Sequence, residues 1–205
     1  MTEGRFASYY DMAFEPFLKR IQRRILHVVK KYGCKNVVDT GCGTGMQTNL
    51  LYKNGIETMG VDKSDAMLKV AMKKEKEIPY LIADITSLPL ANGSFHCAIL
   101  SFIFHLSSYE KIEKIMEETK RVVEEGGILI ITDYGFPAGL KGKIFSVVIN
   151  TIENLAEKEH RKNYHKYMER GAISVLIKEF ALPVLEKHSF YGGNIQTVVL
   201  KNSNP

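Results

Sequence analysis

The chain has 205 residues, a length that suits one domain of ordinary size. Hydrophobic residues make up 45% of it, which excludes a disordered chain because a sizeable core can form. Lysine and arginine number 28 against 23 aspartates and glutamates, so the net charge of +5 is only mildly basic. The basic residues at 19–31 are typical of a solvated helix face, which argues against nucleic acid as the main partner.

The three cysteines, Cys34, Cys42 and Cys97, include no C-x-x-C pair. The sequence therefore predicts neither a disulfide framework nor a zinc site, and no other metal site is expected. No signal peptide and no apolar run of about 18 or more residues is present. We therefore expect a cytoplasmic protein without a membrane span, either a monomer or a homodimer.

The apolar residues from Pro16 to Lys31 recur at helical spacing and predict an amphipathic helix that Gly33 ends. Strands and helices then alternate, which predicts a parallel, doubly wound sheet in an α/β fold. The expected strands are 36–40, 57–61, 79–83, 95–104 and 128–132, and the expected helices are 45–54, 65–75 and a segment from after Ser108 to about 124.

Beyond Asp133 the pattern changes, and residues 141–158 and 172–180 predict further helices. Residues 160–170 are polar and aromatic, and we assign them no element. Two final strands, 182–190 and 194–200, form a predicted hairpin at Gly192-Gly193. That hairpin would place an antiparallel strand in an otherwise parallel, seven-stranded sheet with helices on both faces.

The central stretch, residues 37–45, reads Val-Val-Asp-Thr-Gly-Cys-Gly-Thr-Gly. It predicts a buried strand, a tight turn and a helix start whose backbone N–H groups are free to bind a polar ligand. The spacing lacks the third glycine of a dinucleotide fingerprint and the Lys-Ser/Thr of a phosphate loop. Glycines that serve only contacts between helix and strand are the alternative.

Asp39 precedes this turn, and its carboxylate would repel a pyrophosphate but can accept from an ammonium group. A nucleoside with a cationic amino-acid end is therefore the favoured ligand. The pattern resembles the first motif of class I S-adenosylmethionine (SAM) methyltransferases. In that comparison Asp39 holds the turn or, through water, the amino-acid end of SAM. Gly41 and Gly43 are then the positions where a side chain is least tolerated.

Acidic residues also end the second and third predicted strands. Asp62 can accept both ribose hydroxyls of a nucleoside, although the same position also serves NAD. Asp84 can accept the exocyclic amine of adenine, while the Ile85 N–H donates to a ring nitrogen. Met67 can cover one face of the adenine, and Ser101 and Phe102 can line the methionine side.

The resemblance extends from residue 36 to residue 133. Within class I, the sequence is most similar to the group that includes the ubiquinone and menaquinone methyltransferases. Its motifs are Asp39 to Gly45, Gly60 to Ser64 with Met67, Ala83-Asp84 with Leu88-Pro89 and Ser94-Phe95, and Glu125-Gly126-Gly127 through Asp133. The resemblance implies SAM as cofactor, bound by Tyr10, Asp39, Gly41, Cys42, Gly43, Asp62, Lys63, Met67, Asp84, Ile85 and Ser101. Within the turn, Cys42 is a small filling residue rather than a nucleophile.

A sulfonium methyl is already activated, so the enzyme mainly supplies proximity and a dry site. If a general base is needed, the candidates are His105, Asp133 and Tyr134, at or after the ends of the fourth and fifth strands. The alternatives are a core histidine for His105 and an amine-positioning role for Asp133. His160 and His165 do not share one helical face, so no metal site is expected between them.

We expect a single domain, with residues 1–35 as a helical lid or cap and 134–180 as a substrate-side insertion. Aromatic residues such as Phe136, Tyr164 and Tyr167 predict an apolar or aromatic small-molecule acceptor. The alternatives are a quinone or lipid-like acceptor, a SAM-binding or RNA-binding protein without such catalysis, and an NAD-dependent oxidoreductase. The last would need the third glycine and a Tyr-Lys pair, and neither stands out.

Overall fold

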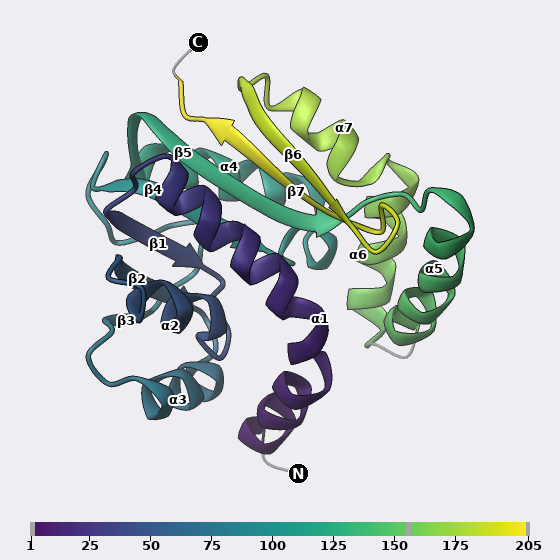
Figure 1. The fold of residues 1–205 in the computed structure, drawn as a ribbon, viewed down its shortest axis with the longest axis horizontal. Helices are drawn as coiled ribbons and strands as arrows, with labels where there is room; N and C mark the ends of the chain where they lie inside the picture. The colour runs from purple at the N-terminus through teal and green to yellow at the C-terminus, as the bar shows by residue number, and fades with distance from the viewer. Residues whose placement is uncertain (1–2, 155–156, 204–205) are drawn as a thin grey trace.

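The computed structural model describes residues 3–154 and 157–203, with side chains from Phe17 onward. Over this range the chain forms one seven-stranded sheet of order β3-β2-β1-β4-β5-β7-β6 (Figure 1). Strands β1 to β5 are parallel, and β7 is antiparallel to both of its neighbours. The strands are β1 (Asn36–Thr40), β2 (Glu57–Asp62), β3 (Tyr80–Ile82), β4 (Phe95–Ser101), β5 (Val123–Tyr134), β6 (Val184–Phe190) and β7 (Ile195–Lys201). The predicted fold class, with its antiparallel C-terminal strand, is confirmed.

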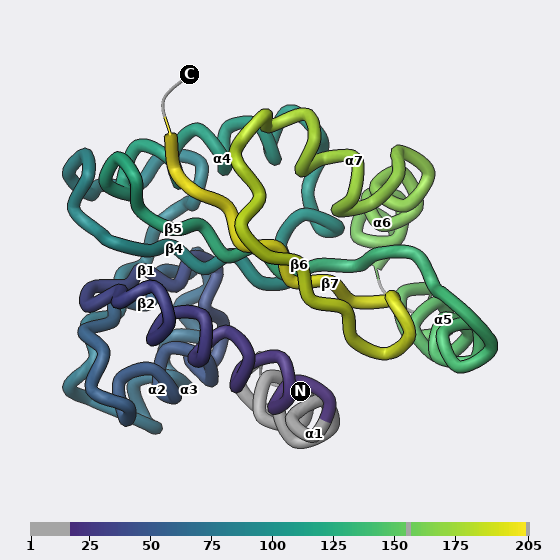
Figure 2. The backbone as a smooth tube through the Cα atoms, turned by 45° about the horizontal axis from the view of Figure 1, so that its top comes forward, coloured from purple at the N-terminus to yellow at the C-terminus, as the bar shows by residue number. Residues whose placement is uncertain are grey.

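Helices cover both faces of this sheet, so the fold has three layers (Figure 2). The helices α1, α2 and α3 lie on one face, and α4 and α7 lie on the other. The helices α5 and α6 lie beyond the end of β5. The helical elements are α1 (Glu3–Lys31), α2 (Met46–Tyr52), α3 (Asp65–Lys74), the 3-10 turn η1 (Phe104–Leu106), α4 (Tyr109–Val122), α5 (Gly139–Asn154), α6 (Lys158–Glu169) and α7 (Ala172–Glu179). None of the helices in the described ranges has the length and apolar character needed to cross a membrane.

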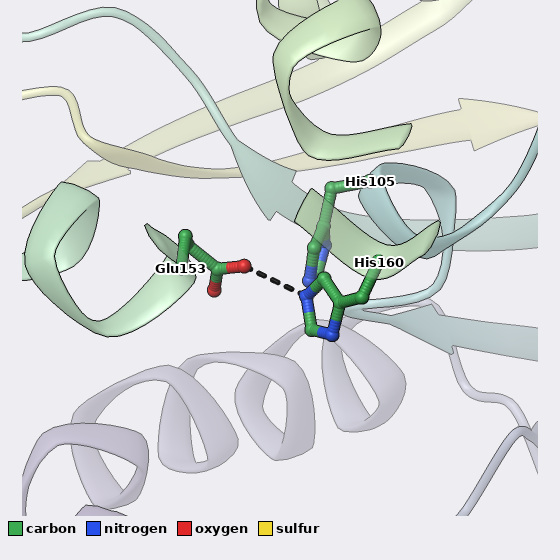
Figure 3. Close-up of side chains that lie close together, drawn as sticks. All are labelled: His105, Glu153 and His160. Carbon is green, nitrogen blue, oxygen red and sulfur yellow. Dashed lines mark hydrogen bonds and ion pairs between the residues drawn. The ribbon is translucent and has the colours of Figure 1, made fainter. Parts of the chain in front are cut away.

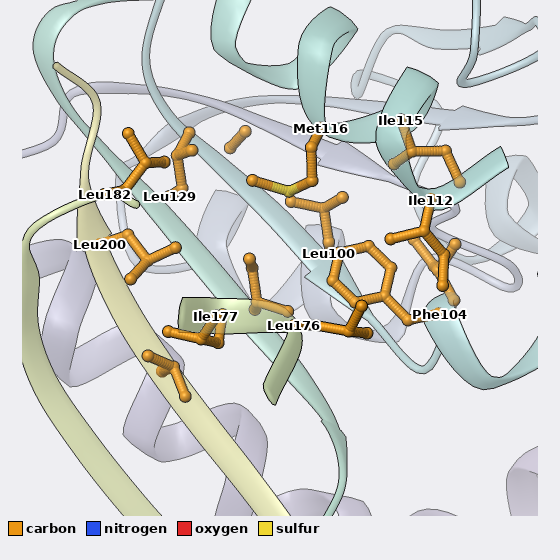
Figure 4. Packing of buried hydrophobic residues seen from close by; sticks show 14 of the residues in the cluster. Leu100, Phe104, Ile112, Ile115, Met116, Leu129, Leu176, Ile177, Leu182 and Leu200 are labelled. Carbon is orange, nitrogen blue, oxygen red and sulfur yellow. The ribbon is translucent and has the colours of Figure 1, made fainter. Parts of the chain in front are cut away.

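Strand β4 shows how the sequence builds two cores, because its side chains alternate between the faces of the sheet. Cys97 and Ile99 join the core beneath α1, whereas Ala98 and Leu100 join the core beneath α4 and α7. Figure 4 shows the second core, where Leu100 lies near Phe104 and near residues of α4 and α7. A strand buried on both faces explains the continuous apolar run in its sequence.

The structure differs from the predicted elements in three places after the first helix. The fourth strand ends at Ser101 and not at residue 104, because Phe102 has a φ of 58° and the chain turns into η1. Strand β5 begins at Val123, before the glycine pair that was expected to precede it. Residues 158–169 form α6 where no element was assigned. The turn at Phe102 matters most, since it directs η1 toward β5.

The first helix also differs from its prediction, since α1 begins at Glu3 rather than near Pro16. The side chains of residues 3–16 lie outside the described part of the structure. The predicted lid at residues 1–35 therefore stays a prediction, and so does the contact between Tyr10 and the cofactor.

Candidate active site

The glycine-rich turn lies at the carboxyl ends of β1 and β2. Gly41, Gly43 and Gly45 have φ angles of 70°, 54° and 71°, a region that residues with a Cβ rarely adopt. The backbone N–H groups of Gly41 and Cys42 both donate to the carbonyl of Val61, at 2.7 and 3.0 Å. The turn is thus fixed to the neighbouring strand by backbone contacts.

Asp62 is the last residue of β2, and its side chain contacts the glycine-rich turn. Its Oδ2 accepts from the backbone N–H of Gly43 at 2.8 Å, and its Oδ1 accepts from that of Ser64 at 2.9 Å. Each carboxylate oxygen can accept a further hydrogen bond. The carboxylate is therefore oriented and still able to accept from the hydroxyls of a ligand.

Asp39 has a different environment from Asp62. Its side chain is buried, and its Oδ2 accepts from the Thr48 hydroxyl of α2 at 2.6 Å. Burial raises the pKa of Asp39 to about 6, and the charge of Asp62 raises it too, while the Thr48 contact lowers it. The Thr48 contact supports the predicted role of Asp39 in holding the turn. Burial also raises the pKa of the Cys42 thiol, which argues against a nucleophilic cysteine.

A cavity of about 220 Å³ opens beside the turn and Asp62. Five of the predicted cofactor residues line it together, namely Gly41, Asp62, Lys63, Asp84 and Ile85. Phe102, which was expected to line the methionine side, and Ala83 of the Ala83-Asp84 motif also line it. Lining residues that the sequence did not single out for the cofactor are Ile103, Leu106, Ser107 and Lys111. The cavity thus combines the acids at the ends of β2 and β3 with the turn after β4.

Asp84 lies at the exposed side of this cavity. Its Oδ1 accepts from the backbone N–H and the hydroxyl of Thr86, at 2.9 and 2.8 Å. These hydrogen bonds lower the pKa of Asp84, so it is ionised at neutral pH. A carboxylate in this position can accept from an exocyclic amine, as its predicted role requires.

Five predicted cofactor residues with described side chains are not among those that line the cavity, namely Asp39, Cys42, Gly43, Met67 and Ser101. Met67 lies in the first turn of α3, and its backbone N–H is used to cap that helix on Ser64. Ser101 ends β4, next to Leu100, which pairs with Thr40 just before the turn. The Ser101 hydroxyl is buried and has no hydrogen-bond partner among the described residues. It is the one predicted cofactor residue whose polar atom is left unsatisfied in the described part of the chain.

The predicted catalytic residues meet at the carboxyl ends of β4 and β5, where Asp133 and Tyr134 are the last residues of β5 and His105 lies in η1 after β4. Asp133 is 1% exposed, and its Oδ1 lies 2.8 Å from the Nδ1 of His105. The backbone N–H groups of Phe104 and Tyr134 also donate to this carboxylate, at 2.8 and 2.7 Å. Burial lowers the pKa of His105, but the carboxylates of Asp133 and Glu153 raise it by more, and the net pKa lies above the ordinary value.

Glu153 and His160 complete this region, and sequence reasoning did not connect them to it. The Tyr134 hydroxyl donates to Glu153 Oε1 at 2.8 Å, and His160 Nε2 lies 2.7 Å from Glu153 Oε2. Figure 3 shows Glu153, His160 and His105 side by side. The available signal was Glu153 itself, a buried acid on the largely apolar helix α5.

Phe102 connects the cavity to this polar region. Its ring centroid lies 6.0 Å from that of Tyr134 and 6.4 Å from that of His105, while the residue also lines the cavity. Its φ of 58° is uncommon for a residue with a bulky side chain, and such strain gathers at functional sites. The cavity and the His105–Asp133 pair are therefore neighbouring parts of one site.

Comparison with known proteins agrees with this geometry. Residues 38–131 match a family model described as a methyltransferase domain. The demethylmenaquinone methyltransferase of Renibacterium salmoninarum is 29% identical over 119 residues, which cover 58% of this chain and 49% of that protein. The enzyme of the same name from Thermotoga maritima is 23% identical over 176 residues, covering 82% of this chain and 76% of that protein. The chain thus spans only about half the length of the first relative.

Among solved structures, a putative SAM-dependent methyltransferase of Methanococcus maripaludis has a TM-score of 0.68 at 16% identity. The match covers 100% of this chain and 95% of that one, and at this identity it supports the fold alone. The donor set of the cavity fits the cofactor of this fold, because an oriented carboxylate and a glycine turn meet where the ribose and the amino-acid end would lie. Residues 38–131 therefore carry the sequence pattern of a methyltransferase domain, and the chain shares the fold of SAM-dependent methyltransferases.

Proposed function

We propose that this protein transfers the methyl group of SAM to a small-molecule acceptor with an apolar or aromatic body. The observation that carries the proposal is the hydrogen bond between Asp62 Oδ2 and the N–H of Gly43, at the edge of the cavity. The strand order reverses between β1 and β4, and ligands of open α/β sheets bind at such a point, beyond the carboxyl ends of the strands.

In this proposal different residues at the cavity contact different parts of the cofactor. Asp62 accepts from the ribose hydroxyls, and Asp84 with the Ile85 N–H contacts the adenine edge. The open backbone at Gly43 lies against the methionine part, since a Cβ built there would meet nothing within 4 Å. Gly41 has no such room, because a Cβ would come within 2.8 Å of Ile103. Position 41 therefore requires a glycine because of the packing of the protein, with or without a cofactor.

The acceptor side is formed by His105, with Asp133 and Tyr134 as positioning residues. Asp133 holds the Nδ1 of His105, so that the other ring nitrogen, Nε2, is left to face a ligand. The ring of Tyr134 lies against that of His105, with centroids 4.7 Å apart. Further rings surround the imidazole, with Tyr164 and Tyr167 at 6.4 and 6.5 Å. A flat or apolar acceptor matches these walls.

When bound, SAM supplies a methyl group on a sulfonium, which leaves as the acceptor attacks in line. The residues of this chain bind the two molecules, align them and keep water out. Where the acceptor atom carries a proton, His105 Nε2 is placed to receive it, and Asp133 stabilises the resulting charge.

A quinone or lipid-like acceptor is the second candidate within this reaction. The relatives from Renibacterium and Thermotoga carry the name demethylmenaquinone methyltransferase. Helix α5 also exposes an apolar face near the acceptor side, formed by Leu140, Ile144, Val147, Val148 and Ile152. A long apolar tail would find a surface there that a small polar acceptor does not need.

A screen of acceptors with SAM, read as release of S-adenosylhomocysteine, tests this proposal. We expect turnover with aromatic or apolar hydroxyl, amine or quinol compounds, and faster turnover with a tailed quinol if the second candidate holds. Binding of SAM without turnover on any acceptor class would instead favour a SAM-binding protein without catalysis.

A further inference from the structure

Three side chains from three separate elements meet at the acceptor side. They are His105 of η1, Glu153 of α5 and His160 of α6, here called the His–Glu–His cluster (Figure 3). One nitrogen or oxygen atom from each lies within 4.8 Å of the other two. All three residue types bind divalent metal ions in proteins.

His105 is oriented as a metal-binding histidine is. Its Nδ1 contacts the carboxylate of Asp133, which is itself held by the backbone N–H groups of Phe104 and Tyr134. The opposite nitrogen, Nε2, has no hydrogen-bond partner among the described residues. A carboxylate on the far nitrogen fixes the tautomer and strengthens the free nitrogen as a ligand, as in the carboxylate–histidine–metal arrangement.

Glu153 is a buried carboxylate, 5% exposed, and a buried charge must be paired or bound to a metal. Its Oε1 accepts from Tyr134, which orients the group, and its Oε2 lies 2.7 Å from His160 Nε2. A cation between the three side chains would take the place of the hydrogen bond between Glu153 and His160.

We propose that the His–Glu–His cluster binds one divalent transition-metal ion of the Zn²⁺, Mn²⁺ or Fe²⁺ class. Two imidazoles and one carboxylate form the ligand set of catalytic zinc sites and of facial-triad sites. Bonds of about 2.0–2.2 Å require the three ligand atoms to move together by roughly 1 Å, which side-chain rotation supplies. Mg²⁺ and Ca²⁺ prefer oxygen ligands, so the two imidazoles select against them.

The cluster leaves room for a further ligand on the ion. The His160 side chain is 33% exposed, while those of His105 and Glu153 are buried, so the open side lies toward His160. With the ion bound, His105 Nε2 is a ligand and no longer receives a proton, and an acceptor oxygen on the ion would lose its proton to solvent more readily. This role rests on the proposed function, but binding of the metal itself does not.

The test uses the full chain without an affinity tag, stripped of metal with a chelator and kept free of SAM. Co²⁺ is titrated and followed by its visible absorption, and Zn²⁺ is titrated by calorimetry, with Mg²⁺ as the comparison. We expect one equivalent of Co²⁺ and of Zn²⁺ to bind, and no saturable binding of Mg²⁺.

Substitutions then assign the site. We expect His160→Ala and Glu153→Gln each to weaken Zn²⁺ binding at least ten-fold, and Asp133→Asn to weaken it about 10–100-fold through His105. His165→Ala is the matched control, since His165 is an exposed histidine of the same helix that contacts only Asn154 and Tyr164 among the described residues. It should leave Zn²⁺ binding unchanged.

The absence of saturable Zn²⁺ and Co²⁺ binding would overturn the proposal, and so would equal binding by wild type and His160→Ala. In either case the cluster is a hydrogen-bonded network that joins α5 to α6. If His160→Ala fails to fold, judged by circular dichroism, His160→Gln takes its place. A separate titration of the same sample with SAM keeps the two proposals apart, because its failure would remove the methyltransferase function and leave the metal result standing.

Discussion

The two halves of the site are built in different ways. On the cofactor side, backbone groups of the glycine turn contact Val61 and the carboxylate of Asp62, all within two neighbouring strands. On the acceptor side, His105 of η1 meets Glu153 and His160, which lie about 50 residues later on the consecutive helices α5 and α6, through their side chains. The difference teaches that the proposed cofactor side is built by local backbone geometry, whereas the proposed acceptor side depends on tertiary contacts.

The largest expected effect is a loss of turnover caused by a change on the acceptor side alone. We expect His105→Gln to lower kcat by about 10²-fold or more, because the imidazole that faces the acceptor is lost. The affinity for SAM, measured by calorimetry on the same sample, should stay unchanged since His105 does not line the cofactor cavity. An equal loss of SAM affinity would mean that the two halves are not separate.

The second-largest expected effect is a loss of SAM affinity on the cofactor side. Asp62→Ala should weaken SAM binding by about 1–3 kcal/mol, the usual cost of leaving polar partners unpaired. The matched control is Asp65→Ala, which removes a carboxylate three residues further on that pairs with Lys69 and does not line the cavity. Unchanged affinity in Asp62→Ala, or equal losses in both variants, would show that the ribose does not bind at Asp62.

A smaller effect separates backbone strain from cofactor contact. Gly43 and Gly55 both have positive φ angles, 54° and 77°, and a Cβ on either would meet nothing within 4 Å. Alanine at either position should therefore lower the free energy of unfolding by about 1–2 kcal/mol, because of the left-handed backbone alone. Only Gly43→Ala should also weaken SAM binding, which titration of both variants would measure. Equal SAM affinities would move the methionine part of SAM away from Gly43.

The smallest effect concerns Asp39 and pH. Its pKa in the folded protein, about 6, lies above the ordinary value of 3.8, so its ionisation opposes folding and this cost appears as pH rises through that window. The cationic end of SAM favours the ionised form. We therefore expect SAM affinity to rise a few-fold between pH 5 and pH 7.5, measured by calorimetry, and to rise less in Asp39→Asn. A pH-independent affinity in the wild type would leave Asp39 as a holder of the turn alone.

The sequence predicted the alternation of strands and helices, the antiparallel C-terminal strand and five predicted cofactor residues that line the cavity, for a physical reason. The period of apolar residues and the glycine spacing are local properties, and parallel strands bring their carboxyl ends to one edge. Thus Gly41, Asp62 and Asp84 meet as predicted. The pairing of His105 with Asp133 was not predicted as a contact, although both were candidates.

The sequence did not predict the turn at Phe102 or the helix α6, and the contacts on the acceptor side depend on both. A positive φ at a phenylalanine has no signature in composition or spacing, so the predicted strand ran on through it. His160 was compared only with His165 on its own helix, whereas its partner is Glu153 of α5. The way in which α5 packs against α6 is set by tertiary contacts, although the connection between the two helices is short, and no local sequence pattern predicts it.

Calorimetric titration of the full chain with SAM, and separately with NAD, tests the central claim most directly. The account predicts saturable binding of one SAM per chain, weakened in Asp62→Ala, and no binding of NAD. Binding of NAD without SAM would contradict it, because the glycine turn and Asp62 would then serve a dinucleotide.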